Sequence, residues 1–185
     1  MNGQVYVFLA NGFEDIEALT VVDLLRRAKI PVKTVAIGDE KKVETSHGVT
    51  LFADALFAEC DFSDAEVLVL PGGQPGTTHL GECAPLRELL RTHNAQGKKL
   101  AAICAAPTVL NKLGLLSGKK ATSYPATEPA MDQVGSYETD TVVVDGNITT
   151  SRGLGTAIDF SLCLIAQLKG QEEADAIAKS VVYIR

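Results

Sequence analysis

Residues 99–107 read Lys99-Leu-Ala-Ala-Ile-Cys-Ala-Ala-Pro107, in which an apolar run stops at a cysteine and a helix-compatible segment begins. Proline is tolerated in the first turn of a helix, and the apolar residues after it predict a helix that Gly114 can end. A cysteine at such a strand-to-helix turn is lifted out of the sheet, as in a nucleophile elbow, and the amides and dipole of the following helix favour its thiolate. We therefore predict that Cys104 is a reactive thiol; the alternative is a small buried apolar residue.

Short apolar runs of this kind alternate with helical patterns along the chain. This rhythm is typical of βαβ units and predicts an α/β fold, in which helices cover both faces of a mostly parallel sheet. The 185 residues fit one domain, residues 1–185. Asp145-Gly146 is a hairpin signal, and residues 122–133 read as a loop with a short helix. Strands are predicted at residues 5–9, 32–37, 67–70, 100–103, 141–144 and 148–150, and helices at about 15–28, after Cys104, and at about 156–168.

Charge and composition argue against several classes of partner. The 17 basic and 23 acidic residues give a net charge of -6, so we expect no nucleic acid partner. The apolar run at residues 5–10 is short and leads into polar residues, so we expect neither a signal peptide nor a membrane span. The cysteine spacing matches no zinc motif, which predicts reduced thiols in the cytoplasm and no metal. Structural or incidental roles are expected for Cys60, Cys83 and Cys163.

A second turn, at residues 67–73, reads Val-Leu-Val-Leu-Pro-Gly-Gly and follows a fully apolar strand. It should lie at the carboxyl edge of the sheet, where ligands bind in open α/β folds. The backbone amides of Gly72 and Gly73 can face a developing oxyanion there, because glycine adopts the required angles without steric cost. The alternative is a plain tight turn.

A third segment, residues 11–17, crosses from the first strand into the first helix and holds three carboxylates. Acidic residues at a helix start most often serve only as dipole partners. Glu17 has the phase to lean toward the sheet edge, opposite to a Glu14 that we expect to be exposed. A protonated Glu17 would donate a hydrogen bond to the thiolate. No histidine adjoins Cys104, so no Cys-His dyad can be read locally.

Four motifs, in this order, resemble the ThiJ/PfpI superfamily, and within it the DJ-one-like branch. They are Gly-x-Glu-x-x-Glu, Leu-Pro-Gly-Gly, Ala-Ala-Ile-Cys-Ala-Ala-Pro and Thr-Ser-Arg-Gly-x-Gly-Thr. The resemblance covers essentially the whole chain. It implies a flavodoxin-like three-layer sandwich, similar to class I glutamine amidotransferases, that usually forms a homodimer.

The resemblance also implies roles for individual residues. Cys104 falls on the family's oxidisable nucleophile and Glu17 on its protonated glutamate, while Gly73 and Ala105 would supply amides. Arg27 matches an arginine near the dimer interface and the pocket.

Other matches depart from the family pattern or lie beside the site. Arg152 matches a position close to the site. Tyr124 stands where human-like members carry a histidine, so a base role there is not implied, and His47 stands where they carry an arginine. The peptidase branch places a histidine directly after its cysteine, and Ala105 at that position argues against peptidase activity.

The implied activity is that of a glyoxalase or deglycase. Cys104 would add to methylglyoxal, or to the hemithioacetal on a glycated thiol or amine, and no cofactor would be needed. A redox-sensing stress protein or chaperone, in which Cys104 is oxidised to a sulfinate, uses the same residues. A third interpretation is a ThiJ-type enzyme related to thiazole biosynthesis, although an evident histidine base is lacking.

Overall fold

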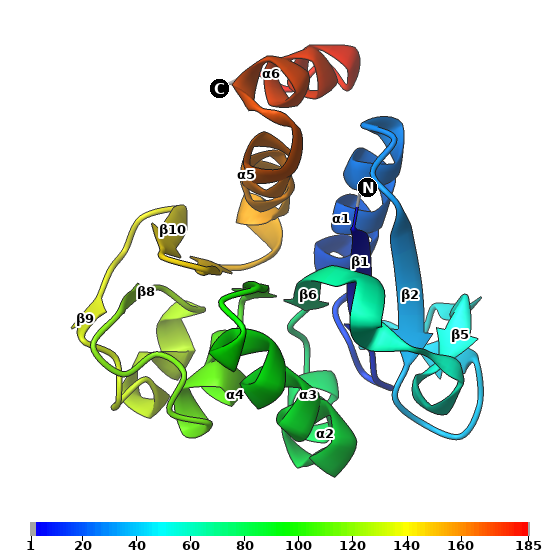
Figure 1. Cartoon of the computed structure of the whole chain (residues 1–185), viewed down its shortest axis with the longest axis vertical. Helices are drawn as coiled ribbons and strands as arrows, with labels where there is room; N and C mark the ends of the chain where they lie inside the picture. The colour runs from blue at the N-terminus through cyan, green and yellow to red at the C-terminus, as the bar shows by residue number, and fades with distance from the viewer. Residues whose placement is uncertain (1–2, 185) are drawn as a thin grey trace.

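A seven-stranded sheet runs through the centre of the computed structural model, which describes residues 3–184 (Figure 1). The strand order is β10-β11-β7-β6-β1-β2-β5, and every neighbouring pair is parallel except β10 with β11. The prediction of a mostly parallel α/β sheet is therefore confirmed. The strands are β1 (Gln4–Leu9), β2 (Val32–Ala36), β5 (Ala55–Leu56), β6 (Ala65–Leu70), β7 (Lys99–Ile103), β10 (Val142–Asp145) and β11 (Ile148–Ser151).

Helices cover both faces of this sheet. Alternate strand residues point to opposite sides, so Val5 and Val7 of β1 join one apolar core while Tyr6 and Phe8 join the other. Burial on both faces explains why the strands read as continuous apolar runs. In Figure 1, α5 and α6 lie on the upper side of the sheet and α2, α3 and α4 on the lower side. The helices are α1 (Asp15–Arg27), α2 (Gly76–Glu82), α3 (Ala84–Ala95), α4 (Pro107–Lys112), α5 (Ala157–Lys169) and α6 (Gln171–Ser180).

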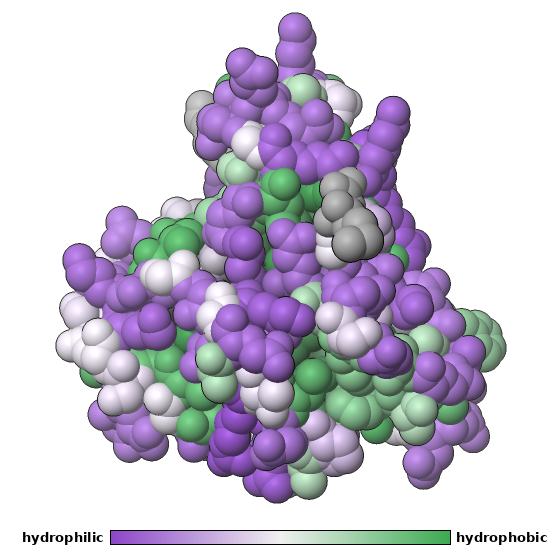
Figure 2. All heavy atoms as spheres, viewed as in Figure 1, coloured by the Kyte–Doolittle hydropathy of each residue, from purple (hydrophilic) through white to green (hydrophobic). Residues whose placement is uncertain are grey.

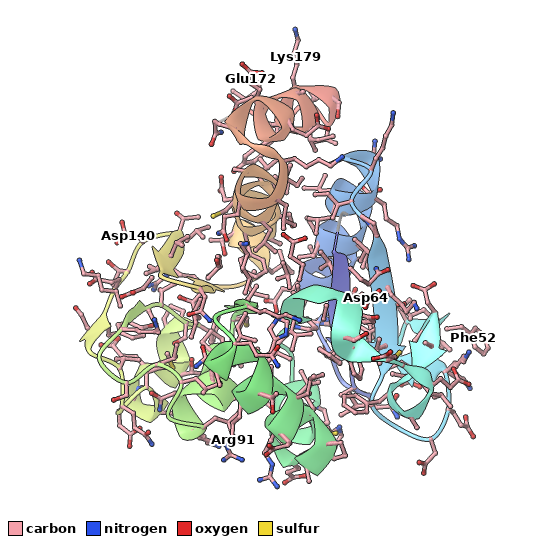
Figure 3. The ribbon with its side chains drawn as sticks, in the orientation of Figure 1. Phe52, Asp64, Arg91, Asp140, Glu172 and Lys179 are labelled. Carbon is pink, nitrogen blue, oxygen red and sulfur yellow. The ribbon has the colours of Figure 1, made fainter. Side chains whose placement is uncertain are left out.

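The predicted strands and helices agree with the structure to within about two residues, and Asp145-Gly146 does turn the β10–β11 hairpin. Residues 122–133 hold the 3-10 helix Pro125–Ala130, as expected. The helices α2, α3 and α6 were not predicted, nor were the short strands β3 (Lys42–Glu44), β4 (Thr50–Phe52), β5, β8 (Lys120–Ala121) and β9 (Ser136–Tyr137). Two or three residues are too few to show a hydrophobic period. Figure 3 shows Phe52 of β4 at the outer edge of the molecule, where it is 75% exposed.

Polar side chains cover much of the face seen in Figure 2, and the apolar groups on it are interspersed among them. Helix α6, at the top of that view, presents mainly hydrophilic side chains. Among residues 3–184, no helix combines the length and the apolar character needed to cross a membrane.

The chain order of the strands reverses between β1 and β6. From β1 the chain continues to β2 on one side of the sheet, and from β6 it continues to β7 on the other. Such a switch point opens a crevice at the carboxyl ends of the strands, where open α/β sheets bind ligands. The three segments singled out in the sequence follow β1, β6 and β7, so they meet at this edge.

Candidate active site

Cys104 follows β7 directly and has a left-handed backbone conformation, with φ 63°. This conformation costs a non-glycine residue roughly 1–2 kcal/mol, so the surrounding structure must hold it in place. The Cys104 amide donates to the carbonyl oxygen of Ser151 (3.0 Å), and its carbonyl accepts from the amide of Tyr124 (2.7 Å). The thiol is only partly buried. The turn therefore presents the sulfur at the sheet edge, as a nucleophile elbow does.

Glu17 lies in the first turn of α1 and is 1% exposed. Its Oε2 accepts a hydrogen bond from the amide of Gly72 (2.9 Å), and the amide of Leu154 also donates to the carboxyl group. A further hydrogen bond joins the side chains of Glu17 and Cys104. The buried carboxyl group and the thiol therefore form a directly coupled pair.

Glu14 is buried rather than exposed, so the sequence expectation for it was wrong. It caps α1, with Oε2 accepting from the amide of Glu17 at 2.7 Å, and is 8% exposed. A capping side chain folds back over its own helix end, and here that end is covered by the neighbouring loops.

Burial raises the pKa of Glu17 from 4.5 to about 7, and the charge of Glu14 adds to this, while hydrogen bonds from Cys104 and the amides of Gly72 and Leu154 oppose it. Burial also raises the pKa of the Cys104 thiol to about 12, with further contributions from the charge of Glu17 and the hydrogen bond to it. The amides of Ala105 and Gly73 act in the opposite direction.

The amide of Ala105 at the helix end does lower the pKa of the Cys104 thiol, as expected, but this effect does not decide the net shift. Helix α4 has only six residues, and burial beside a carboxylate outweighs its dipole. The hydrogen bond between the two side chains lowers the pKa of Glu17 and raises that of Cys104, so the thiol donates in it to the Glu17 carboxylate. With the proton on Glu17 instead, the repulsion between the two charges would be absent. The thiolate therefore forms when Glu17 and Cys104 hold one proton between them and that proton lies on the Glu17 carboxyl group.

Alkylation of Cys104 is expected to follow the first ionisation of this pair. The pair loses its first proton near pH 7, the pKa of about 7 found for Glu17, and its second only near the pKa of about 12 found for Cys104. The fraction with the proton on Glu17 is constant between these limits, so the rate should rise through about pH 7 and then level off. Iodoacetamide labelling followed by peptide mass spectrometry measures it, with the other three cysteines as internal controls. A rate that rises only above pH 9 would contradict a shared proton.

The buried carboxyl group also makes stability depend on pH. The pKa of Glu17 is about 7 in the folded protein and 4.5 in the unfolded chain. Between these two pH values the unfolded chain binds fewer protons than the folded protein, so the unfolding free energy falls as pH rises. The pKa shift corresponds to about 3 kcal/mol of unfolding free energy. This stabilisation is fully present below about pH 4.5, is lost between about pH 4.5 and pH 7, and is absent at higher pH. We expect Glu17→Gln, which cannot ionise, to gain about 3 kcal/mol relative to the natural protein between pH 4.5 and pH 8. Urea unfolding of the natural protein and of Glu17→Gln at pH 4.5 and at pH 8 tests this. If the unfolding free energies of the two proteins differed by the same amount at both pH values, the prediction would be wrong.

Gly72 does not have the role expected from the sequence. Its amide already donates to Glu17, so it is not free to bind an oxyanion. The amides of Gly73 and Ala105 do approach the sulfur of Cys104. A glycine is instead needed at position 72 so that the side chains of Cys104 and Glu17 can pack against the backbone. A Cβ there would lie 2.6 Å from Cys104 Cβ and 2.7 Å from Glu17 Oε2.

Substitution of Gly72 with alanine is expected to destabilise the protein by about 1–3 kcal/mol and to displace the Cys104 side chain, because the added methyl group overlaps both partners. Gly155→Ala is the matched control, because a Cβ at Gly155 meets nothing within 4 Å. Denaturant midpoints and Cys104 labelling rates report the two effects. Equal behaviour of both variants would contradict the packing argument.

Two of the other predicted residues lie beside the pair. Tyr124 contacts Cys104 through its backbone amide, and the residue is 48% exposed. Arg152 follows β11 and donates from Nη1 to Thr122 Oγ1 (3.4 Å).

The remaining two predicted residues do not meet Cys104 within the chain. Arg27 is paired with Asp23 (2.7 Å) at the far end of α1, roughly 15 Å along the helix from Glu17. His47 contacts Asp15, with 3.1 Å between Nδ1 and Oδ1. The other two histidines are held elsewhere: His79 beside the carbonyl of Asn11, and His93 buried in α3.

Sequence reasoning missed Gly153 and Leu154. A Cβ built on Gly153 would lie 3.8 Å from Cys104 Sγ, 3.8 Å from Glu17 Oε1 and 3.5 Å from the Tyr124 ring. This glycine therefore keeps the site open, while the amide of Leu154 donates to Glu17. The Ser-Arg-Gly stretch marked the segment, but nothing local indicated that it faces Glu17.

Two hollows lie at the same edge of the sheet, with volumes of about 510 and 380 Å³. Asn11 lines both, together with residues of β3 and of the loops around it. Cys104 lines neither. These two hollows are therefore not part of the site formed by Cys104 and Glu17.

Comparison with known proteins agrees with this arrangement. The family model described as DJ-1/PfpI family matches residues 3–167. Protein dj-1beta of Drosophila melanogaster is 41% identical over 183 residues, 98% of each chain. A protein of Caenorhabditis elegans named glutathione-independent glyoxalase DJR-1.2 is 30% identical over 166 residues, 90% of this chain and 88% of that one. A structure of oxidized Toxoplasma gondii DJ-1 superposes with a TM-score of 0.93 at 38% identity, covering 99% and 100% of the two chains. The chain therefore belongs to the DJ-1/PfpI family, as its four motifs predicted.

Proposed function

We propose that this protein is a cofactor-independent glyoxalase or deglycase that acts on methylglyoxal or on glycated thiols and amines. The observation that carries the proposal is the hydrogen-bonded pair of Cys104 and a buried Glu17 whose pKa is about 7. General acid–base catalysis is most effective when the pKa of the group lies near the working pH. The C. elegans relative named a glyoxalase supports the same reaction class.

The reaction begins when the Cys104 thiolate attacks the aldehyde carbon of methylglyoxal, forming a carbon–sulfur bond, while the carbonyl oxygen takes the proton of Glu17 to give a hemithioacetal. Glu17, now a carboxylate, removes the hydrogen of that carbon as a proton and returns it to the neighbouring carbon, while the hydroxyl proton of the hemithioacetal passes to the ketone oxygen. The first carbon is thereby oxidised to a thioester and the second reduced to an alcohol, so no outside oxidant is needed. Water then cleaves the thioester, which gives lactate and restores the thiol.

The amides around the sulfur supply the remaining parts of this mechanism. Those of Gly73 and Ala105 lie at the sulfur and offer N–H donors close to where an oxyanion would form. Gly153 leaves room for the reactant beside Cys104 and Glu17.

Repeated turnover tests the proposal. With methylglyoxal in large molar excess, we expect lactate to form in many equivalents per protein chain, by NMR, while the intact mass of the protein stays unchanged. Lactate formed at no more than the spontaneous rate would overturn the assignment.

The second candidate is a redox-sensing stress protein or chaperone. A partly exposed thiol, held by two amides beside a carboxyl group that can donate, is suited to binding a sulfinate, and the T. gondii relative was described in an oxidized form. In this case mild peroxide should add two oxygen atoms at Cys104, with no turnover of methylglyoxal.

We further propose a homodimer in the cytoplasm, with Arg27 near the interface. The proposal follows the family resemblance and the position of Arg27 at the exposed end of α1. Light scattering on the purified protein measures the mass directly, and a mass of one chain would contradict the dimer.

A further inference from the structure

A space about the size of one methyl group lies beside the two reacting side chains. A Cβ built on Gly153 would lie 3.8 Å from Cys104 Sγ, 3.8 Å from Glu17 Oε1 and 3.5 Å from Cδ2 of the Tyr124 ring. All three are ordinary van der Waals distances, so a carbon atom fits at this point without displacing its neighbours. A reactant atom that fills this space therefore contacts the thiol, the carboxyl group and the ring together.

We propose that the ring of Tyr124 determines specificity, because it limits the size of the substituent that the reacting aldehyde can carry on the side that faces Gly153. This role rests on the proposed function and narrows its substrate class to α-oxoaldehydes whose substituent is about as large as a methyl group. Methylglyoxal belongs to this class, since its ketone carbon carries a methyl group. Phenylglyoxal, which carries a benzene ring in that position, does not.

The proposed reaction itself brings the substituent to this space. Cys104 bonds to the aldehyde carbon, while Glu17 has to reach both that carbon and its neighbour. A point that lies 3.8 Å from both Sγ and Oε1 is therefore where the second carbon, or the group that it carries, comes to lie. The edge of the Tyr124 ring closes this space on a third side.

The backbone that carries the ring is held on both sides. The amide of Tyr124 donates to the carbonyl of Cys104 (2.7 Å). The carbonyl of Tyr124 accepts from the amide of Thr127 (2.8 Å) and from its Oγ1 (2.7 Å). The ring is thus tied to the backbone of the nucleophile itself, and only rotation about its two side-chain torsions can move it.

The competing interpretation is that the Tyr124 hydroxyl acts as an acid or a base. In the described part of the chain, every hydrogen bond of Tyr124 is made by its backbone. An activating acid or base is normally oriented by a further group, and this hydroxyl has no such group within residues 3–184. The ring edge, in contrast, already lies at the space beside the sulfur.

Alkylation of Cys104 with two reagents of different size tests this role without turnover. Iodoacetamide is compact, whereas N-benzyliodoacetamide carries a ring, and the ratio of their rate constants at the Cys104 peptide measures the room beside the sulfur. Tyr124→Ala should raise the rate of the bulky reagent relative to the small one by about tenfold or more, the discrimination that a methylene-sized overlap gives. Tyr124→Phe should keep the ratio of the natural protein. Phe52→Ala is the matched control, because it removes a 75% exposed ring at the outer edge of the molecule, and it should leave both rates unchanged (Figure 3).

Gly153→Ala is the converse test, because its methyl group occupies the space directly. Both reagents should react more slowly with Cys104, and the bulky one should lose more. Gly155→Ala serves as the control, since a Cβ there meets nothing within 4 Å. Urea midpoints of both variants show whether the fold is retained.

Steady-state kinetics connect the ring to turnover. In Tyr124→Ala the ratio of kcat/KM for phenylglyoxal to that for methylglyoxal should rise. The KM for methylglyoxal should increase by about fourfold, the effect of exposing one methylene-sized group, whereas loss of an acid or base would lower kcat. An unchanged reagent ratio in Tyr124→Ala, or a Tyr124→Phe ratio altered as much as that of Tyr124→Ala, would overturn the inference. The alkylation ratio decides this even if methylglyoxal is not turned over, so failure of the proposed enzyme activity is seen separately.

Discussion

Cys104→Ser is expected to lower the rate of methylglyoxal consumption by on the order of 10³-fold or more. The serine hydroxyl fits the same space and keeps the amides and Glu17 in place, but it is a far weaker acid than the thiol. Glu17, with a pKa of about 7, cannot ionise it to a useful extent. The covalent step is therefore lost while the fold is retained. Initial rates of methylglyoxal loss, measured at fixed enzyme concentration, give the ratio directly.

Cys83→Ser is the matched control for this substitution. Cys83 is also a partly exposed free cysteine, it lies at the start of α3, and serine is a favoured residue at that position of a helix. We expect this variant to keep full activity. If Cys104→Ser retained comparable activity to Cys83→Ser, Cys104 would not be the nucleophile.

Glu17→Gln is expected to reduce turnover by about 10²–10⁴-fold, the usual contribution of a general acid–base group. Glutamine has nearly the same shape and still accepts from the amide of Gly72, but it cannot take a proton from the substrate carbon and return it. The loss should therefore appear in kcat, because the step that moves the proton is the one affected. Steady-state kinetics across pH 5 to 9 should also show that the ionisation near pH 7, seen in the natural protein, has disappeared.

Glu17→Asp provides the contrast, since it keeps an ionisable group but withdraws it from the sulfur by one methylene. We expect an intermediate activity that retains a pH dependence. A Glu17→Gln variant as active as the natural protein would remove Glu17 from the mechanism, whatever its effect on stability.

The main elements of the fold could be predicted because their signals are local. An apolar run that stops at glycine, proline or cysteine and is followed by an amphipathic stretch specifies a strand, a turn and a helix within about 15 residues. The strands β1, β6 and β7 and the helix α1 were found in this way, and their parallel order brought Cys104, Gly73 and Glu17 to one edge of the sheet. Helix α3 was missed although its buried residues Leu86, Leu90 and His93 recur at helical spacing, whereas the short strands at the periphery hold too few residues to show a period.

The details of the candidate site depend on contacts between segments far apart in the chain. The Gly72 amide donates to Glu17, Leu154 completes the carboxyl group's partners, and Gly153 opens the space beside the sulfur. The burial of Glu14 was likewise invisible in the sequence.

By itself, the sequence determined which residue would stand at a strand-to-helix turn, because backbone conformation there follows from neighbouring residues. Only the tertiary structure decided the charge state of the site. The pKa values of Glu17 and Cys104 are raised first by burial, and burial depends on which loops cover them. The amides at the start of α4 lower the pKa of Cys104 as the sequence predicted, but desolvation and a nearby carboxylate raise it more strongly than the end of a six-residue helix lowers it.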